Sequence, residues 1–360
     1  MTPKKKVEFL IIGQGLAGSL LGWRLIQQGH SVLLLDPCLT HTASRTAAGL
    51  INPVTGKRLV KTDHVEQYLT AAKELYAELA DFFGLTFLHE REQVRLFQSD
   101  AELDQWNKRK NQAEYAPFLA ERFNAKDKKY LKETSLGGFK QQQCAYLDTV
   151  VLLDHLRDFF LQQGCFIKAQ MDLSELNISS SFVEWHGHTA DKIIFCDGYH
   201  LQHNPWFSWL PLQPVQGDIL TLKTDHPLPN EIVQFGKWLL PLANGQLKLG
   251  ASWQWQPLDE KPNEKAALDL LDACYPYFPH LRQAQRLEHN VGIRPGTRDK
   301  QPFLGQHPEQ SNLLVFNGFG SKGSLLIPWH AERFLRYFTR AEPLPTSADI
   351  NRYTHDYFTR

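Results

Sequence analysis

Two short apolar runs open the chain, with an amphipathic stretch between them. They span residues 7–12 and 31–36, and the residues between them fit a helix that ends near Gly29. Mainly apolar runs of this length are typical of buried strands, and a glycine often follows the last turn of a helix. The pattern therefore predicts a strand, a helix and a second strand at the start of the chain.

Helical patterns recur further along the chain. Asp63 followed by Glu66 is typical of a helix start. A second helix is expected over 150–163, where Gly164 ends it before a short strand. The charge-dense stretch 100–132 is interpreted as solvated helices. The helix after Asp63 has one apolar face, formed by Val65, Leu69, Ala72, Leu75, Tyr76, Leu79, Phe82 and Phe83.

The pattern then changes to short strands. Residues 191–198 are interpreted as a buried strand that ends in a glycine turn. Short strands bounded by Pro, Gly and Asn are expected at 215–222, 232–240 and 246–252. These three strands predict an antiparallel sheet.

The end of the chain repeats the arrangement of its beginning. A strand at 313–317 leads into a glycine-rich turn at 318–323 and then into a helix from Ser324. We therefore expect an α/β fold with a discontinuous Rossmann-like domain, into which a mostly antiparallel β-sheet domain (an α+β insert) is placed.

The turn after the first strand has the residues of a dinucleotide site. Gly13 permits a tight turn, Gly15 lets the backbone approach a pyrophosphate, and Gly18 lets helix and strand pack closely. Asp36 ends the second strand, where a carboxylate accepts hydrogen bonds from a ribose diol and disfavours a 2′-phosphate. This unit is common to NAD and FAD sites. A nicotinamide dehydrogenase would continue the strand and helix alternation, whereas this chain leaves it for a long polar loop at 40–62.

Composition narrows the class of partner. The chain has 360 residues and a formal net charge of zero, which gives no electrostatic reason to expect nucleic acid or an anionic membrane surface. No segment approaches the ~20 continuous apolar residues of a membrane span. The five cysteines lack CxxC spacing, and no metal-spaced set of His or Cys is present. We expect a cytoplasmic protein with reduced thiols, no metal and a small-molecule partner.

Taken in order, the motifs resemble those of the glycine oxidase, sarcosine oxidase and D-amino-acid oxidase (DAO) superfamily of FAD-dependent enzymes. The resemblance runs from Val7 to about Tyr337. It implies FAD as the cofactor. No cysteine lies in the glycine turn 318–323, where the sarcosine oxidases carry a covalent flavin link, so FAD is expected to be noncovalent. Besides the opening glycines and Asp36, the motifs lie at 42–51, 190–198, 212–218, 238–252, 292–305 and 317–323.

The resemblance also implies a domain division. Segments 1–85, 145–205 and 290–360 are expected to form the FAD-binding domain, and segments 86–144 and 206–289 the substrate domain. The positions expected to contact the cofactor are Gly13, Gly15, Leu16, Ala17, Gly18, Asp36, Ser44, Arg45, Thr46, Ala47, Ala48, Gly49, Met171, Asp197, Gly198, Arg294, Gly318, Phe319, Gly320, Ser321, Lys322, Gly323 and Ser324.

Arg294 is the residue expected to bind the substrate. In the resembling enzymes this arginine binds the substrate carboxylate beneath the flavin, and a guanidinium offers a planar fork to two carboxylate oxygens. The alternative is a buried ion pair with Asp299 or Asp218. Lys322 is expected at the pyrimidine edge of the flavin, and the alternative is a solvated loop lysine.

Lys57 and Arg58 directly follow the flavin loop. One hypothesis is that they line the mouth of the active site and select an acidic substrate. The alternative is that they are solvated loop charges.

The resemblance implies an amine or amino-acid oxidase or dehydrogenase. Such an enzyme moves a hydride from the carbon that bears nitrogen to flavin N5, and water hydrolyses the resulting imine. Oxygen and a carrier remain open as the electron acceptor. Two alternatives are a flavin oxidase that acts on the amine of a modified tRNA nucleoside and a flavoprotein without turnover.

Overall fold

The computed structural model describes residues 4–128, 131 and 136–358. Its opening strand, β1 (Lys6–Ile12), lies between β2 (Val32–Asp36) and β14 (His188–Phe195) and is parallel to both. Helix α1 (Leu16–Gln27) connects β1 to β2. The strand, helix and strand predicted from the hydrophobic pattern are confirmed.

The first sheet has eight strands. Strand β14 also pairs in parallel with the strand that precedes the last glycine turn, so both ends of the chain join one sheet, as expected. The other members are β11 (Phe166–Lys168), β12 (Asn177–Ile178), β13 (Val183–Trp185), β20 (Phe303–Gln306) and β21 (Leu313–Asn317).

The strands of this sheet are buried on both faces. Phe9 and Ile11 of β1 pack into a core shared with α1, α3, α5 and α7, whereas Leu10 and Ile12 pack on the opposite face. Both faces are covered, so β1 is continuously apolar from Phe9 to Ile12 and does not alternate there. The other helices are α2 (Ala43–Thr46), α3 (Val65–Phe83), α4 (Asp100–Arg109), α5 (Thr149–Gln162), α6 (Glu264–Cys274), α7 (Gly323–Thr339) and α8 (Thr354–Phe358).

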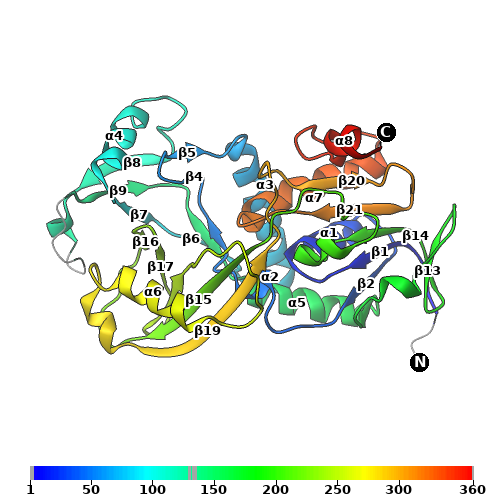
Figure 1. Ribbon diagram of the computed structural model, residues 1–360, viewed down its shortest axis with the longest axis horizontal. Coiled ribbons are helices and arrows are strands. Elements are labelled where there is room, and N and C mark those ends of the chain that lie inside the picture. The colour runs from blue at the N-terminus through cyan, green and yellow to red at the C-terminus, as the bar shows by residue number, and fades with distance from the viewer. Residues whose placement is uncertain (1–3, 129–130, 132–135, 359–360) are drawn as a thin grey trace.

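A second eight-stranded sheet lies beside the first, and both chain ends lie on the side of the first sheet (Figure 1). Its neighbouring strands are antiparallel, except that β16 and β7 are parallel. In spatial order it consists of β19 (Gln285–Arg294), β15 (Val215–Lys223), β18 (Gln246–Gly250), β17 (Trp238–Pro241), β16 (Ile232–Gln234), β7 (Gln93–Leu96), β9 (Gly138–Gln141) and β8 (Leu119–Phe123).

The long polar stretch at 40–62 contains short elements in addition to loops. It includes α2 and three two-residue strands, one of which joins a small sheet with β6 and β10. The three strands of the stretch are β3 (Leu50–Ile51), β4 (Val54–Thr55) and β5 (Val60–Lys61), and β3 joins β6 (Leu88–Glu90) and β10 (Ala145–Leu147).

Three local predictions are wrong. The strand expected at 232–240 is interrupted, because Gly236 has a φ of +84° and the chain turns there between β16 and β17. Asp63 does not cap α3, since the N-cap position is His64 and no side-chain hydrogen bond caps the helix. The stretch 100–132 is helical only in its first part, because Leu119–Phe123 pairs with β9 as a strand. Residues 129–130 and 132 of this stretch lie outside the described residues.

Within the described residues, no helix is both long enough and apolar enough to cross a membrane.

Candidate active site

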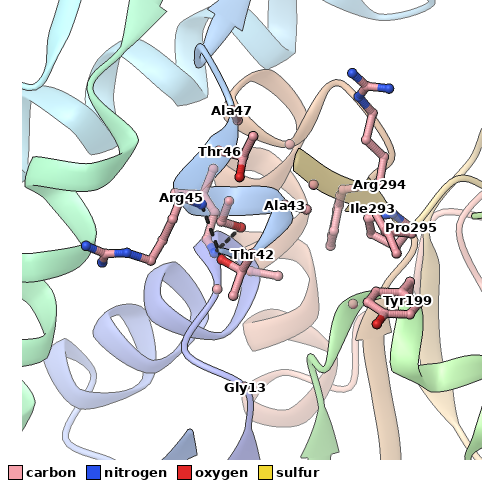
Figure 2. A pocket seen from close by; sticks show the side chains of 18 of the residues that line it. Gly13, Thr42, Ala43, Arg45, Thr46, Ala47, Tyr199, Ile293, Arg294 and Pro295 are labelled. Carbon is pink, nitrogen blue, oxygen red and sulfur yellow. Dashed lines mark hydrogen bonds between the residues drawn. The ribbon is translucent and has the colours of Figure 1, made fainter. Parts of the chain in front are cut away.

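A cavity of about 640 Å³ lies at the carboxyl ends of β1 and β2 and extends to the second sheet (Figure 2). Its volume is within the range of small-molecule and cofactor sites. The residues predicted to contact a cofactor that do line it are Gly13, Gly15, Leu16, Ala17, Asp36, Ser44, Arg45, Thr46, Ala47, Ala48, Gly49, Met171, Asp197, Gly198, Arg294, Phe319, Gly320, Ser321, Gly323 and Ser324.

The opening glycines shape one end of the cavity. Gly13 has a φ of +100°, and a Cβ on it would lie 2.7 Å from the carbonyl oxygen of Cys196. A Cβ on Gly18 would lie 2.0 Å from the carbonyl oxygen of Gly13, so Gly18 packs behind the cavity wall and does not line it. Helix α1 begins after Gly15 with no acidic residue in its first turn. Its N-terminus therefore suits an anion such as a pyrophosphate.

Asp36 lies at the end of β2 on the same wall. Its Oδ2 accepts the backbone N–H of Gln14 at 2.7 Å, and its Oδ1 accepts that of Cys38 at 2.6 Å. Each carboxylate oxygen can accept a second hydrogen bond, so Asp36 retains capacity for ribose hydroxyls.

The short helix α2 forms the middle of the cavity wall. Thr42 caps it through the backbone N–H of Arg45. Thr46 Oγ1 donates to the carbonyl oxygen of Val291 at 3.0 Å, which fixes α2 against β19. Arg45 pairs with Asp154 of α5, with N···O distances of 2.7 and 3.3 Å. Figure 2 shows the Arg45 side chain pointing away from Arg294.

Arg294 is the last residue of β19, and its guanidinium lies against Gly217 of β15. A Cβ on Gly217 would lie 2.1 Å from Arg294 Nη2, so a side chain there would fill the same space. The ring of Trp253 lies 5.1 Å from the guanidinium carbon. Burial lowers the pKa of Arg294 to about 10, against the opposing charge of Asp218, and Arg294 is therefore cationic at pH 7.

The two ion pairs considered for Arg294 do not form. Asp218 accepts hydrogen bonds from Ser252 Oγ and from the backbone N–H of Asn263, and Asp299 pairs with Arg352. In the described part of the chain, Nη1 of Arg294 is buried without an acceptor. A buried cationic donor without a partner is costly, so an anionic ligand is the natural acceptor for it.

The C-terminal glycine turn, which follows β21 of the first sheet, forms part of the cavity wall. Asn317 Nδ2 donates to Asp197 Oδ1 at 3.1 Å and to the carbonyl oxygen of Gly198 at 3.0 Å, which holds the two predicted strand ends together. Burial raises the pKa of Asp197 to about 7. Gly318 does not line the cavity, because it packs against Thr297 and Phe303.

Three predicted cations lie away from the main cavity. The Lys322 side chain lines a smaller neighbouring cavity of about 170 Å³, where Nζ donates to Thr62 Oγ1 at 2.9 Å and burial lowers the pKa of the lysine. Lys322 is therefore not a solvated loop lysine. Lys57 and Arg58 are exposed, and neither lines the main cavity, because the turn between β4 and β5 carries them outward. This placement favours the alternative of solvated loop charges.

Several residues that line the cavity were not predicted. Tyr199 and Glu260, which are hydrogen-bonded to each other, line it, as do Trp253 and Arg157. Tyr199 directly follows the predicted Gly198, and Trp253 lies directly beyond the last predicted strand, so their positions could have suggested them. Glu260 and Arg157 reach the cavity only through tertiary contacts.

The fold and the cavity together define a protein that binds a dinucleotide. The glycine loop, the α1 N-terminus and Asp36 fit the adenosine diphosphate half of such a cofactor, and the small residues at 47–49 let backbone approach a planar ring. Residues 8–335 match the family described as FAD dependent oxidoreductase (DAO). The chain belongs to this family of FAD-dependent oxidoreductases.

Curated relatives match the chain over different lengths. Glycine oxidase from Pseudomonas putida is 26% identical over 165 residues, which cover 43% of this chain and 45% of that protein. The tRNA 5-methylaminomethyl-2-thiouridine biosynthesis bifunctional protein MnmC from Acinetobacter baylyi is 25% identical over 363 residues, which cover 97% of this chain and 55% of that protein. The chain thus spans about half the length of these relatives.

The fold is similar to that of solved flavoenzymes. Glycine oxidase from Bacillus cereus superposes with a TM-score of 0.81 at 18% identity, over 94% of this chain and 96% of that chain. At this identity the likeness concerns the fold alone. It agrees with the expected combination of a Rossmann-like FAD domain and a β-sheet substrate domain.

Proposed function

We propose that the protein oxidises the carbon–nitrogen bond of an amino acid, or of a secondary amine that carries a carboxylate. The observation that carries this proposal is the buried, unpartnered Nη1 of Arg294 at the end of the cavity formed by the second sheet. FAD, when bound, would supply the two-electron acceptor for a hydride from the carbon that bears nitrogen. Water would hydrolyse the resulting imine to a carbonyl compound and an amine or ammonia.

The protein residues position the substrate. Arg294 donates to both carboxylate oxygens through its planar fork, and Gly217 leaves the space in which the guanidinium lies. Trp253 covers the guanidinium and limits its contact with water, which strengthens its attraction for an anion. With the carboxylate fixed, the carbon that bears nitrogen is held in one orientation, and orientation is the main requirement of a hydride transfer.

We further propose that the predicted cofactor residues that line the cavity hold FAD noncovalently. The domain division 1–85, 145–205 and 290–360 for FAD, with 86–144 and 206–289 for substrate, is supported by the two large sheets. Strands of the first sheet fall in the former segments and strands of the second in the latter, except that β19 crosses the boundary at 290. The cytoplasmic location stays a prediction.

The test is an anaerobic titration of the purified holoenzyme with glycine, sarcosine, proline, glutamate, aspartate and D-amino acids. We expect one of them to bleach the flavin absorbance, and re-aeration then separates an oxidase from a dehydrogenase that uses a carrier. Arg294→Met should retain the flavin spectrum and lose reduction at low substrate concentration. Bound flavin that no carboxylated amine reduces would contradict the proposal.

A second candidate is oxidation of a modified tRNA nucleoside amine. It is favoured by the match to the MnmC protein over 97% of this chain, against 43% for the Pseudomonas putida glycine oxidase. Trp253, which lines the cavity, and Trp255, whose ring lies 5.9 Å from that of Trp253, are 55% and 52% exposed. Unpaired bases stack on such rings. The zero net charge opposes RNA binding. Tight tRNA binding at physiological salt, with flavin reduction by carboxymethylated tRNA, would support this candidate.

A further inference from the structure

Gln14, which lies between the first two glycines of the opening turn, has a fully engaged side chain. The residue is only 3% exposed. Its Nε2 donates to Ser19 Oγ at 3.0 Å and to the carbonyl oxygen of Leu153 at 2.9 Å, and its Oε1 accepts from Nε of Arg157 at 2.8 Å. These bonds fix the Gln14 amide, and the amide in turn fixes the orientation of the Arg157 guanidinium.

Arg157 lies on α5, lines the main cavity and has donors to spare. In the described part of the chain, no residue supplies an acceptor to its Nη1 or Nη2, and no carboxylate pairs with it. Arg45 lines the same cavity but is neutralised by Asp154, one turn earlier on α5. Arg157 is thus a cation whose charge is not balanced by a neighbouring carboxylate.

Arg157 is close to the residues that are expected to bind the dinucleotide. Gln14 joins Gly13 to Gly15, and its backbone N–H donates to Asp36, which faces the ribose position. Burial raises the pKa of the Cys38 thiol, and the charge of Arg157 partly opposes this effect. Arg157 is therefore held by the residue that links the glycine turn to Asp36, and α1, whose N-terminus suits a pyrophosphate, begins two residues after it.

We propose that Arg157, oriented by Gln14, binds an anionic oxygen of the FAD pyrophosphate. Arg157 is then a cofactor-binding residue, and Gln14 is its positioning residue. A guanidinium held through Nε presents its two Nη groups in a fixed plane, so little side-chain freedom is lost when the phosphate binds. The contact lies in the adenosine diphosphate half, away from Arg294 and the substrate.

The experiment measures the dissociation constant of FAD for the apoprotein by quenching of flavin fluorescence. Arg157→Met should weaken FAD binding about 10- to 100-fold, the range for a charge-assisted hydrogen bond, and should reduce the dependence of binding on salt. Gln14→Leu should weaken it less, by roughly three- to tenfold. The double variant should be weakened by less than the product of the two factors, because both changes remove one interaction.

Two controls separate this role from a structural one. Riboflavin lacks the pyrophosphate, so its affinity should be unchanged in Arg157→Met. Asp158→Asn alters the exposed neighbour of Arg157 and should leave FAD affinity unchanged. Equal FAD affinity in Arg157→Met and the wild type, or an equal loss of riboflavin affinity, would overturn the proposal. If Arg157→Met does not fold, Arg157→Lys decides the question, because it should retain the salt dependence while binding FAD more weakly.

Discussion

The Arg294 guanidinium occupies space that any side chain on Gly217 would fill, since a Cβ there would lie 2.1 Å from Nη2. Gly217→Val should displace the guanidinium while FAD stays bound. We expect the affinity of the holoenzyme for small carboxylates to fall about tenfold or more, as for the loss of a charge-assisted hydrogen bond. This affinity is measured by titrating the holoenzyme with acetate and with benzoate while the flavin absorbance is monitored.

Arg294→Met provides the matched comparison for Gly217→Val. Both variants should lose carboxylate affinity, and combining them should add little, because both remove one contact. Undiminished benzoate binding in Gly217→Val would show that the carboxylate binds elsewhere.

Asp197 makes the stability of the protein depend on pH. Burial raises its pKa to about 7 in the folded protein, whereas an unfolded aspartate has a pKa of about 4. From about pH 4 to about pH 7 the folded chain holds a proton that the unfolded chain has lost, so the free energy of unfolding falls as pH rises. Asp197→Asn mimics the protonated form. Its stability advantage over the wild type should therefore grow across this window and level off above it.

Urea unfolding of the two apoproteins at several pH values in this window measures that difference. Asn317 can still donate to the oxygen of an asparagine at position 197, so the hydrogen bond is preserved. A stability difference that is constant across the window would mean that Asp197 titrates normally in the folded protein.

At the scale of elements, the segment 251–263 is bonded to β15 of the second sheet at both ends by the buried carboxylate of Asp218, and in its middle by Gln216. Ser252 Oγ donates to Asp218 Oδ2 at 2.7 Å, and the backbone N–H of Asn263 donates to Oδ1 at 3.0 Å. His289 Nε2 lies 2.9 Å from the same Oδ1. Asp218 therefore holds both ends of the segment that carries Trp253 to the cavity.

Asp218→Ala should release this segment. The variant leaves several buried donors without an acceptor, and we expect the free energy of unfolding to fall by about 3 kcal/mol. Limited proteolysis followed by mass spectrometry should find new cleavage within 251–263. Asp225→Ala, at an exposed position near the end of β15, should change neither quantity. Protection of 251–263 equal to that of the wild type would mean that other contacts hold the segment.

Sequence patterns predicted the elements that depend only on residues close together in the chain. The run at β1, the apolar face of α3 and the glycine after α5 each depend on neighbours in sequence. They agree with the structure, except that Phe82 of the predicted α3 face is 54% exposed. The turn at Gly236 was missed because apolar residues continue on both sides of it. The contact of Gln14 with Arg157 joins residues 143 positions apart, and no sequence spacing indicates such a pair.

Side-chain direction was also beyond local prediction. The glycine turn at Lys322 lies where the sequence indicated, but the lysine amine donates to Thr62, which directly follows β5. Arg294 was predicted from a family motif. The reason why it stays unpaired lies in tertiary structure, since Asp218 and Asp299 are each occupied by partners that the sequence does not reveal.

At the scale of the whole molecule, the cavity draws its walls from both large sheets, so FAD binding should stabilise the two together. Gly13 and Asp36 line the cavity from the first sheet, and Gly217 and Arg294 line it from the second sheet. A ligand that binds only the folded state at 100 times its Kd adds about 2.7 kcal/mol to the free energy of unfolding. For a chain of this length that free energy corresponds to a rise in Tm of several degrees, and the rise should increase with FAD concentration.

Differential scanning calorimetry of the apoprotein, with FAD or riboflavin added, tests this expectation. Riboflavin occupies only the ring end of the cavity and cannot engage Asp36 or the N-terminus of α1, so it should raise Tm less than FAD at the same concentration. If one sheet unfolds first in the apoprotein, FAD should merge the two transitions into one, because the ligand contacts both sheets. A Tm that does not respond to FAD would mean that the cavity does not bind the cofactor in the folded protein.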